Sequence, residues 1–260
     1  MSEAASQRPR PVPWWAPLAL SWSFLTVLPA PWVEADARSL AASVAFFPLV
    51  GLALGALLGG GGIALGLLLP PGPTAVLLLA SSAVLTGGLH LDGLMDTADG
   101  VFGGRTVEGR LEIMRDSRVG SFGAIAGALA LLGQYSCLAQ LGGTERLVAL
   151  AVALAMSRWG MALAIALFPS ARSAGLGSAF HEAGGRWPLV IATAIVAASA
   201  LATPVLGLAS GIATVLVVTL GGRFLTGRLG GLTGDTYGGL AVVSETLVLY
   251  LAVVLQAARP

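Results

Sequence analysis

Long apolar segments recur along this chain of 260 residues, and they constrain its fold more than any other feature. Each is close to the ~20 residues that a helix needs to cross a bilayer. Hydrophobic residues make up 56% of the sequence and charged residues only 10%, a composition typical of helical membrane proteins with several spans. The sequence therefore predicts an all-α, polytopic membrane helix bundle with seven spans, at 44–69, 74–91, 119–141, 147–168, 188–208, 209–226 and 238–257.

The N-terminal region differs from these spans. Residues 1–13 are polar, carry Arg8 and Arg10 and contain prolines, so we expect a disordered tail. Residues 14–33 are apolar but are interrupted by prolines, and they hold four of the six tryptophans. Because Trp favours the membrane interface, an interfacial or re-entrant helix is predicted here rather than a span. Residues 14–260 are then expected to form one membrane-embedded domain.

Arginine accounts for all fourteen basic residues, and its distribution predicts how the chain sits in the membrane. The seven predicted spans place most arginines on the side of the N-terminal tail and only Arg146 and Arg259 on the other side. Cytoplasmic loops of membrane proteins carry an excess of Arg and Lys, so the arginine-rich side is predicted to be cytoplasmic. The tail is then cytoplasmic, and the C-terminus lies across the membrane from it.

Polar residues concentrate in one segment, 88–123, which holds six of the thirteen acidic residues and four of the fourteen arginines. Asp92, Asp96 and Asp99 are spaced by four and three residues, so on a helix their carboxylates share one face. Like charges on one face repel one another unless a cation lies among them. Oxygen ligands without Cys favour Mg²⁺ or Mn²⁺ over zinc. The segment therefore predicts a magnesium site of the kind used in phosphate chemistry.

Further charges follow in the same segment after a glycine-rich turn. Glu108, Glu112 and Asp116 repeat the four-residue spacing. Asp116 is a candidate for completing the metal site or for accepting a proton. The candidates for phosphate binding are the arginines of this segment, Arg110, Arg115 and Arg118. The alternative is a solvated helical hairpin in which these arginines only neutralise the acids.

Two charged residues fall well inside predicted spans, whereas Arg223 lies close to the boundary of one. Arg158 lies near the middle of its span, and Glu245 lies about two turns into the last one. Each costs roughly 2.5–3.5 kcal/mol to insert into lipid, so each must face a partner or a wet cavity. We expect both to line a substrate cavity beneath the acidic cluster; a structural ion pair between them is the alternative.

The last polar stretch, 230–239, is rich in glycine. Glycines allow backbone N–H groups to approach an anion closely. Thr233 and Asp235 add a hydroxyl and a carboxylate, so this stretch is predicted to hold the second substrate or a second metal. A flexible connector between helices would have the same composition.

Glycines at four-residue spacing also mark one span. Gly51, Gly55 and Gly59 form a ridge of small residues, which lets another helix approach closely. The two histidines indicate no further site, because His90 and His181 lack the spacing of zinc ligands. We expect both histidines at polar surface or capping positions.

These motifs together resemble a known family. Residues 91–100 (LDGLMDTADG) followed by 111–123 (LEIMRDSRVGSFG) resemble the signature of the cobalamin synthase family, the adenosylcobinamide-GDP ribazoletransferases. Other blocks of the family recur in the same order, at 24–29 (FLTVLP), 47–51 (FPLVG), 157–158 (SR), 175–177 (GLG) with Phe180, and 231–235 (GLTGD) with Glu245.

This resemblance implies a Mg²⁺-dependent transferase that joins adenosylcobinamide-GDP to α-ribazole or its 5′-phosphate and releases GMP. It implies that Asp92, Asp96 and Asp99 hold Mg²⁺ on the diphosphate, with Asp99 and Asp116 as candidate catalytic residues. The remaining candidates bind substrate: Arg110, Arg115, Arg118, Arg158, Thr233, Asp235 and Glu245. A multi-pass protein of the prokaryotic cytoplasmic (inner) membrane is expected, with its active site facing the cytoplasm. No nucleic-acid partner is expected, and a homo-oligomer is left open.

Two other functions are weighed against this one. Gly88, Asp92 and Asp96 match the second half of the motif of the CDP-alcohol phosphotransferases, but the first half is missing upstream. A transporter would spread its acids through the centres of the spans and show repeated halves. Here the acids cluster at one membrane face, and no internal repeat is found.

Overall fold

The computed structural model describes residues 13–34, 36–172, 180 and 186–258, and this part of the chain is helical, apart from turns, loops and one isolated β-bridge. The helices are α1 (Ala16–Leu25), α2 (Ala37–Ser43), a 3₁₀ turn η1 (Val44–Phe46), α3 (Phe47–Gly66), α4 (Pro71–Leu85), α5 (Leu89–Gly103), α6 (Val107–Ile113), α7 (Ser121–Gln140), α8 (Gly143–Leu167), α10 (Trp187–Ala200), α11 (Pro204–Leu229) and α12 (Gly234–Ala257). The predicted tail, apart from Pro13, and His181 lie outside the described residues.

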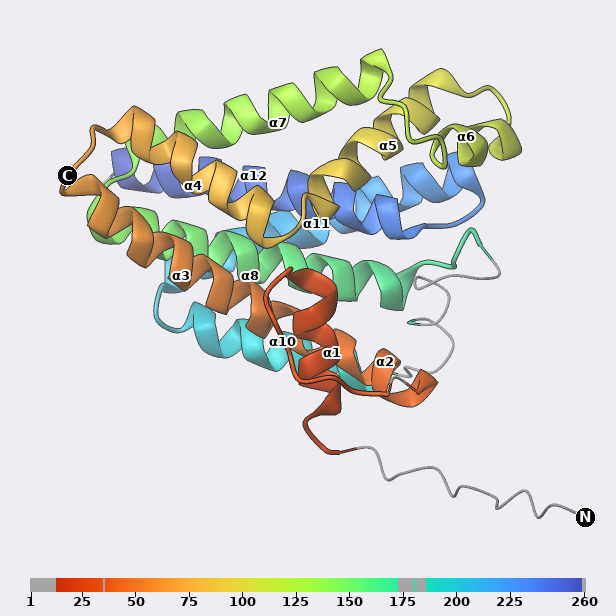
Figure 1. Cartoon of the computed structure of the whole chain (residues 1–260), viewed down its shortest axis with the longest axis horizontal. Helices are drawn as coiled ribbons and strands as arrows, with labels where there is room; N and C mark the ends of the chain where they lie inside the picture. The colour runs from red at the N-terminus through yellow and green to blue at the C-terminus, as the bar shows by residue number, and fades with distance from the viewer. Residues whose placement is uncertain (1–12, 35, 173–179, 181–185, 259–260) are drawn as a thin grey trace, which may run out of the picture.

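The long helices run side by side along the longest axis of the molecule (Figure 1). One end of this bundle carries α6, the segment that follows α8 and the turn between α11 and α12, and we call it the site end. The other end carries the C-terminus, the α3–α4 turn and the α10–α11 turn, and we call it the opposite end (Figure 1).

In the part of the chain that the structure describes, five segments are long and apolar enough to cross a membrane: 37–66, α7, α8, α11 and α12. Helices α4 and α5 pass the same test only as a pair that is bent by 87°. The bend lies at Gly87 and Gly88. Their φ angles of 60° and 71° are accessible to glycine but strained for other residues. A polytopic helical membrane protein is thereby confirmed, with the predicted second span broken in two.

The predicted boundary between the fifth and sixth spans, 188–208 and 209–226, needs correction, since a single helix continues through residues 208 and 209. Helix α10 ends at Ala200, and α11 begins at Pro204 and continues through Gly207 and Gly211. Proline suits the first turn of a helix, where its missing N–H would have no partner in any case. Helix α10 is therefore only 14 residues long, shorter than a typical span.

The predicted glycine ridge is confirmed, because α3 packs along α8 through it. A Cβ atom at Gly51, Gly55 or Gly59 would overlap the backbone of α8. Gly60 and Gly61 lie on another face of α3 and have open space around them. The small residues thus allow the backbones of the two helices to come into contact. Such close packing increases the van der Waals contact that holds helices together in lipid.

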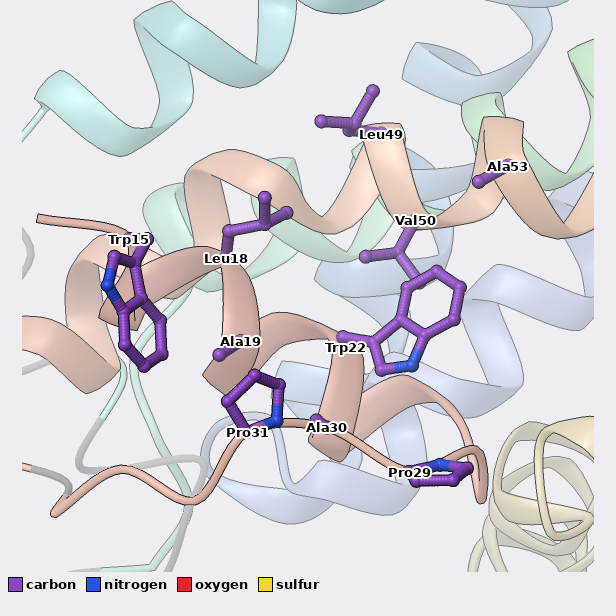
Figure 2. A pocket seen from close by; sticks show the side chains of 10 residues that line it. All are labelled: Trp15, Leu18, Ala19, Trp22, Pro29, Ala30, Pro31, Leu49, Val50 and Ala53. Atoms are coloured by element: carbon purple, nitrogen blue, oxygen red, sulfur yellow. The ribbon is translucent and has the colours of Figure 1, made fainter.

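Helix α1 has 10 residues, too few for a span, and the chain after it folds back beside it. An apolar pocket of about 520 Å³ lies between α1, this returning segment and α3. Figure 2 shows the side chains that line it. Its walls are Trp15, Leu18, Ala19, Trp22, Pro29, Ala30, Pro31, Leu49, Val50 and Ala53. Trp14 and Trp32 are almost fully exposed nearby. The interfacial position of α1 stays a prediction, which these exposed indoles favour.

Candidate active site

Helix α5 carries the predicted acidic face and lies against α12. Asp92 is exposed, Asp96 is half-buried and Asp99 is buried, so the three carboxylates run from the surface inward. Gly93 explains the close approach of α12, because a Cβ atom there would lie 2.6 Å from the carbonyl oxygen of Asp235. The glycine of the motif therefore makes room for a fourth acidic residue beside the first three.

Asp235 is held at the start of α12 by a capping box. The Thr233 hydroxyl accepts a hydrogen bond from the Thr236 N–H (3.3 Å), and the Thr236 hydroxyl accepts one from the Thr233 N–H (2.8 Å). Thr233 also lies 3.3 Å from the Asp235 carboxylate, to which its hydroxyl can donate. Thr233 is buried and serves the helix terminus, so in this conformation it positions Asp235.

The four carboxylates form one electrostatic cluster. Asp92, Asp235 and Asp99 all lie close enough to Asp96 to repel its negative charge, and Arg172 is the cation that attracts it. Among the described residues, no three His, Cys, Asp or Glu side chains are grouped tightly enough to ligate one ion by themselves. Mg²⁺ is usually held by only one or two carboxylates together with waters and substrate phosphates. The donors present therefore fit a magnesium ion that arrives with a phosphate group.

Asp99 has a second role that its spacing did not reveal. Its carboxylate accepts hydrogen bonds from the N–H groups of Gly120 and Gly123, both at 2.8 Å. These N–H groups belong to the N-cap residue and the first turn of α7, so the Asp99 side chain of α5 caps that helix. A Cβ atom at either glycine would overlap the carboxylate, which is why both positions are glycine.

Helix α6 presents the second group of charges. The Arg110 guanidinium donates to the carbonyl oxygens of Gly104 (3.1 Å) and Arg228 (2.9 Å), which ties α6 to the end of α11. Arg115 is exposed. Arg118 pairs with Asp116 at 2.6 Å in the loop before α7. The hydrogen bonds from Arg118 lower the pKa of the Asp116 carboxyl to about 2, so while this pair holds, Asp116 is a poor proton acceptor.

Arg158 and Glu245 form the ion pair that the sequence left as an alternative, at 2.8 Å between α8 and α12. Arg158 also donates to the Ser157 hydroxyl (2.7 Å), while its buried Nε has no partner in the part of the chain that the structure describes. Their predicted contact with substrate stays a prediction. His90 is buried against Gly238 of α12, which corrects its expected surface position. The correction follows from the α5–α12 packing, which a single sequence does not reveal.

Arg172 was not predicted from the sequence as a site residue. Its Nη2 atom lies 3.3 Å from the Asp235 carboxylate. The only signal was a lone arginine beyond a predicted span on the arginine-rich side. Its place beside the acids depends on a tertiary contact.

Fold and site together define a helical membrane protein that gathers carboxylates and arginines at one end of its bundle, a donor set suited to phosphate groups and a divalent cation. A profile of the family "Cobalamin-5-phosphate synthase" matches residues 17–253. The chain therefore belongs to the cobalamin-5-phosphate synthase family, as the resemblance predicted.

Relatives with assigned names agree with this family. The adenosylcobinamide-GDP ribazoletransferase of Desulforamulus reducens is 42% identical over 246 residues, which cover 93% of this chain and 98% of the relative. The enzyme of the same name from Roseiflexus sp. is 42% identical over 255 residues, covering 95% and 94%. The one from Desulfitobacterium hafniense is 41% identical over 244 residues, covering 89% and 94%. No solved structure matches the chain significantly.

Proposed function

We propose that this protein is an adenosylcobinamide-GDP ribazoletransferase. It joins adenosylcobinamide-GDP to α-ribazole or α-ribazole 5′-phosphate and releases GMP, leaving adenosylcobalamin or its 5′-phosphate. The observation that carries the proposal is the cluster of Asp92, Asp96, Asp99 and Asp235 at the contact of α5 with α12, in a chain of this family. The family also favours this reaction over a CDP-alcohol phosphotransferase and over a transporter.

The reaction needs little covalent chemistry from the protein. A hydroxyl of the ribazole attacks the β-phosphorus of the diphosphate and gives up its proton to a base or to water. The bond from that phosphorus to the bridging oxygen breaks, and GMP leaves with the electron pair. Negative charge grows on the phosphoryl oxygens and on the departing phosphate during this step. Catalysis therefore consists chiefly of positioning the two substrates and neutralising that charge.

Asp92 and Asp96 are the carboxylates with most bonding capacity left for a cation, since both oxygens of Asp99 already accept backbone N–H groups. Mg²⁺ held by these residues would neutralise charge on the diphosphate and its leaving group. Asp99 then contributes its charge and one remaining lone pair on each oxygen. Arg110, Arg115 and Arg118 lie on the adjoining α6 and the loop after it. Arg115 is exposed, and Arg110 and Arg118 would bind phosphates by exchanging their present partners.

We also propose that the site end faces the cytoplasm of a prokaryotic cell, with the protein in the inner membrane. The arginine distribution supports this orientation, because Arg105, Arg110, Arg115 and Arg118 lie in the segment between α5 and α7. A reporter fused to the C-terminus should then be active only if the reporter works outside the cytoplasm. A cytoplasmic C-terminus would contradict this orientation.

The activity is tested with the purified protein in detergent or liposomes. The assay supplies adenosylcobinamide-GDP, α-ribazole and Mg²⁺, and it follows GMP and the cobamide product. We expect both products in equal amounts, and we expect EDTA to abolish them and excess Mg²⁺ to restore them. Folded wild-type protein that forms neither product under these conditions would contradict the proposed function.

A further inference from the structure

We propose that Arg172 is a phosphate-binding residue of this site, and that Asp235 holds its guanidinium until the diphosphate binds. This inference rests on the proposed function and assigns a role to a residue that the sequence motifs did not single out.

The backbone before Arg172 is fixed to the start of α12. The Ala171 N–H donates to the Leu232 carbonyl oxygen, and the Leu232 N–H donates to the Pro169 carbonyl oxygen, both at 2.8 Å. These bonds form a short parallel bridge between two segments that are about sixty residues apart. Gly231 allows it, since a Cβ atom there would lie 2.6 Å from the Ala171 nitrogen.

Arg172 itself is steadied by Ser170. The Ser170 hydroxyl donates to the Arg172 carbonyl oxygen (2.9 Å) and lies 3.3 Å from the Arg172 nitrogen, whose N–H donates to it. The same bridge sets both Arg172 and the Thr233 cap of α12, so the guanidinium and the Asp235 carboxylate are placed by one piece of backbone. This arrangement is built by the fold rather than by a chance meeting of two flexible side chains.

The bonding of the guanidinium leaves capacity for a ligand. Arginine has five N–H donors, but within the described residues the Arg172 side chain makes one hydrogen bond, to Asp235 at 3.3 Å. Charge-assisted bonds are ordinarily about 2.7–2.9 Å long, so this one is loose. Its Nε is buried and has no partner among the described residues. The side chain is 26% exposed, and a substrate can therefore reach it.

Three other arginines of the protein are already engaged. Arg110 is bound to two backbone carbonyls, and Arg118 makes a short ion pair with Asp116. Arg158 is 2% exposed and paired with Glu245. Arg172 is the arginine whose field reaches both Asp96 and Asp235. A diphosphate drawn to the acids by Mg²⁺ would meet this guanidinium, whose planar fork matches phosphate oxygens. Asp235 would then be free to bind the cation or its waters.

The test compares Arg172→Gln and Arg172→Lys with the wild type, and uses Arg223→Gln as the matched control. Arg223 is an exposed arginine of α11 towards the same end, and it has no place in the site. One readout is steady-state kinetics with each substrate varied. The other is equilibrium binding of GDP with Mg²⁺, which needs no turnover.

For Arg172→Gln we expect kcat/KM for adenosylcobinamide-GDP to fall at least 100-fold and GDP binding to weaken at least tenfold. The KM for α-ribazole should change less than threefold, and the unfolding temperature should be unchanged. Arg172→Lys should recover part of the loss, and Arg223→Gln should behave as wild type.

Arg172→Gln with wild-type kinetics and GDP binding would overturn the inference, and so would a loss that only follows a lower unfolding temperature in both Arg172 variants. The wild-type assay separates this result from a failure of the proposed function. If the wild type binds GDP but makes no cobamide, the function fails, and the binding comparison still decides the role of Arg172.

Discussion

A buried charged side chain from another helix lies at each end of α7. The two side chains differ in how much capacity they have left to bind a ligand. At the site end, the Asp99 carboxylate caps the first N–H groups of α7. At the opposite end, the Arg146 Nε donates to the carbonyl oxygens of Leu138 (3.1 Å) and Leu141 (2.8 Å), the last turn of the same helix. Both charges satisfy groups that a helix terminus leaves unpaired, and both have the sign that the helix dipole favours.

The two ends of α7 also differ in the residues that surround each charged side chain. Arg146 is 3% exposed, and the apolar side chain of Leu78 and Gly62 of α3 lie near it. Asp99 instead neighbours Asp96, which is repelled by three carboxylates and attracted by one guanidinium. A buried charge is thus not in itself a sign of chemistry in this protein. A group of like charges with unused capacity for hydrogen bonds or metal binding is the better sign, because a ligand of opposite charge is needed to neutralise it.

The largest effect is expected for Asp96→Asn. Cobamide formation should fall at least ~100-fold, the usual cost of removing one group that stabilises transition-state charge. The unfolding temperature should stay or rise, because the change removes one of several mutually repelling charges. Product formation and thermal unfolding in detergent measure the two effects.

Glu112→Gln is the control for this change, since it removes an exposed carboxylate of α6 outside the cluster. It should leave cobamide formation within twofold of the wild type and the unfolding temperature within about one degree. An active Asp96→Asn enzyme would contradict the role in the reaction that we assign to the carboxylates at the site end.

Asp99→Asn is expected to lower both activity and stability. The amide would turn an N–H group towards the N–H of Gly120 or Gly123, so one buried donor loses its acceptor, at a cost of about 1–3 kcal/mol. Gly123→Ala should reproduce the effect from the other side, since its Cβ atom displaces the carboxylate. If Asp99→Asn lost activity without any loss of stability, its capping role would be refuted.

Arg146→Met should lower stability alone. It keeps the apolar stem and leaves the carbonyls of Leu138 and Leu141 without their donor, so we expect a loss of about 1–2 kcal/mol. The values of kcat and KM should equal those of the wild type at a temperature where both proteins are folded. A selective drop in kcat would mean that the opposite end takes part in the reaction, and the contrast between the two ends of α7 would fail.

The contrast also explains what the sequence could predict. Spacing within one helix placed Asp92, Asp96 and Asp99 on a common face, and the same reasoning found the ridge of Gly51, Gly55 and Gly59. Both patterns need only the 3.6-residue period of a helix. Contacts between distant segments were not predictable, because no local period encodes them.

The misses share this cause. The bond from Asp99 to Gly123 joins residues 24 positions apart, and the bond from Arg172 to Asp235 joins residues 63 positions apart. The turn before Pro204 was misplaced because apolar residues continue on both sides of it, so hydropathy gives no boundary. The bend at Gly87 was missed for the same reason, since the apolar pattern of α4 leads directly into α5.

The smallest effects on activity should come from Gly55 and Gly60 of α3, whose surroundings include neither Asp99 nor Arg146. Gly55→Ala would press a methyl group onto the Leu150 carbonyl and the Ala151 backbone of α8, and overpacking of this kind costs about 1–3 kcal/mol. Gly60→Ala, five residues on in the same helix, adds its methyl group to open space and gains up to about 1 kcal/mol from helix propensity. Thermal unfolding of the two variants should therefore shift in opposite directions, while the KM values of both stay at the wild-type level. Equal shifts for the two would show that α3 and α8 are not held in contact through this ridge. A change in KM for Gly55→Ala alone would show that the packing of α3 on α8 reaches the site.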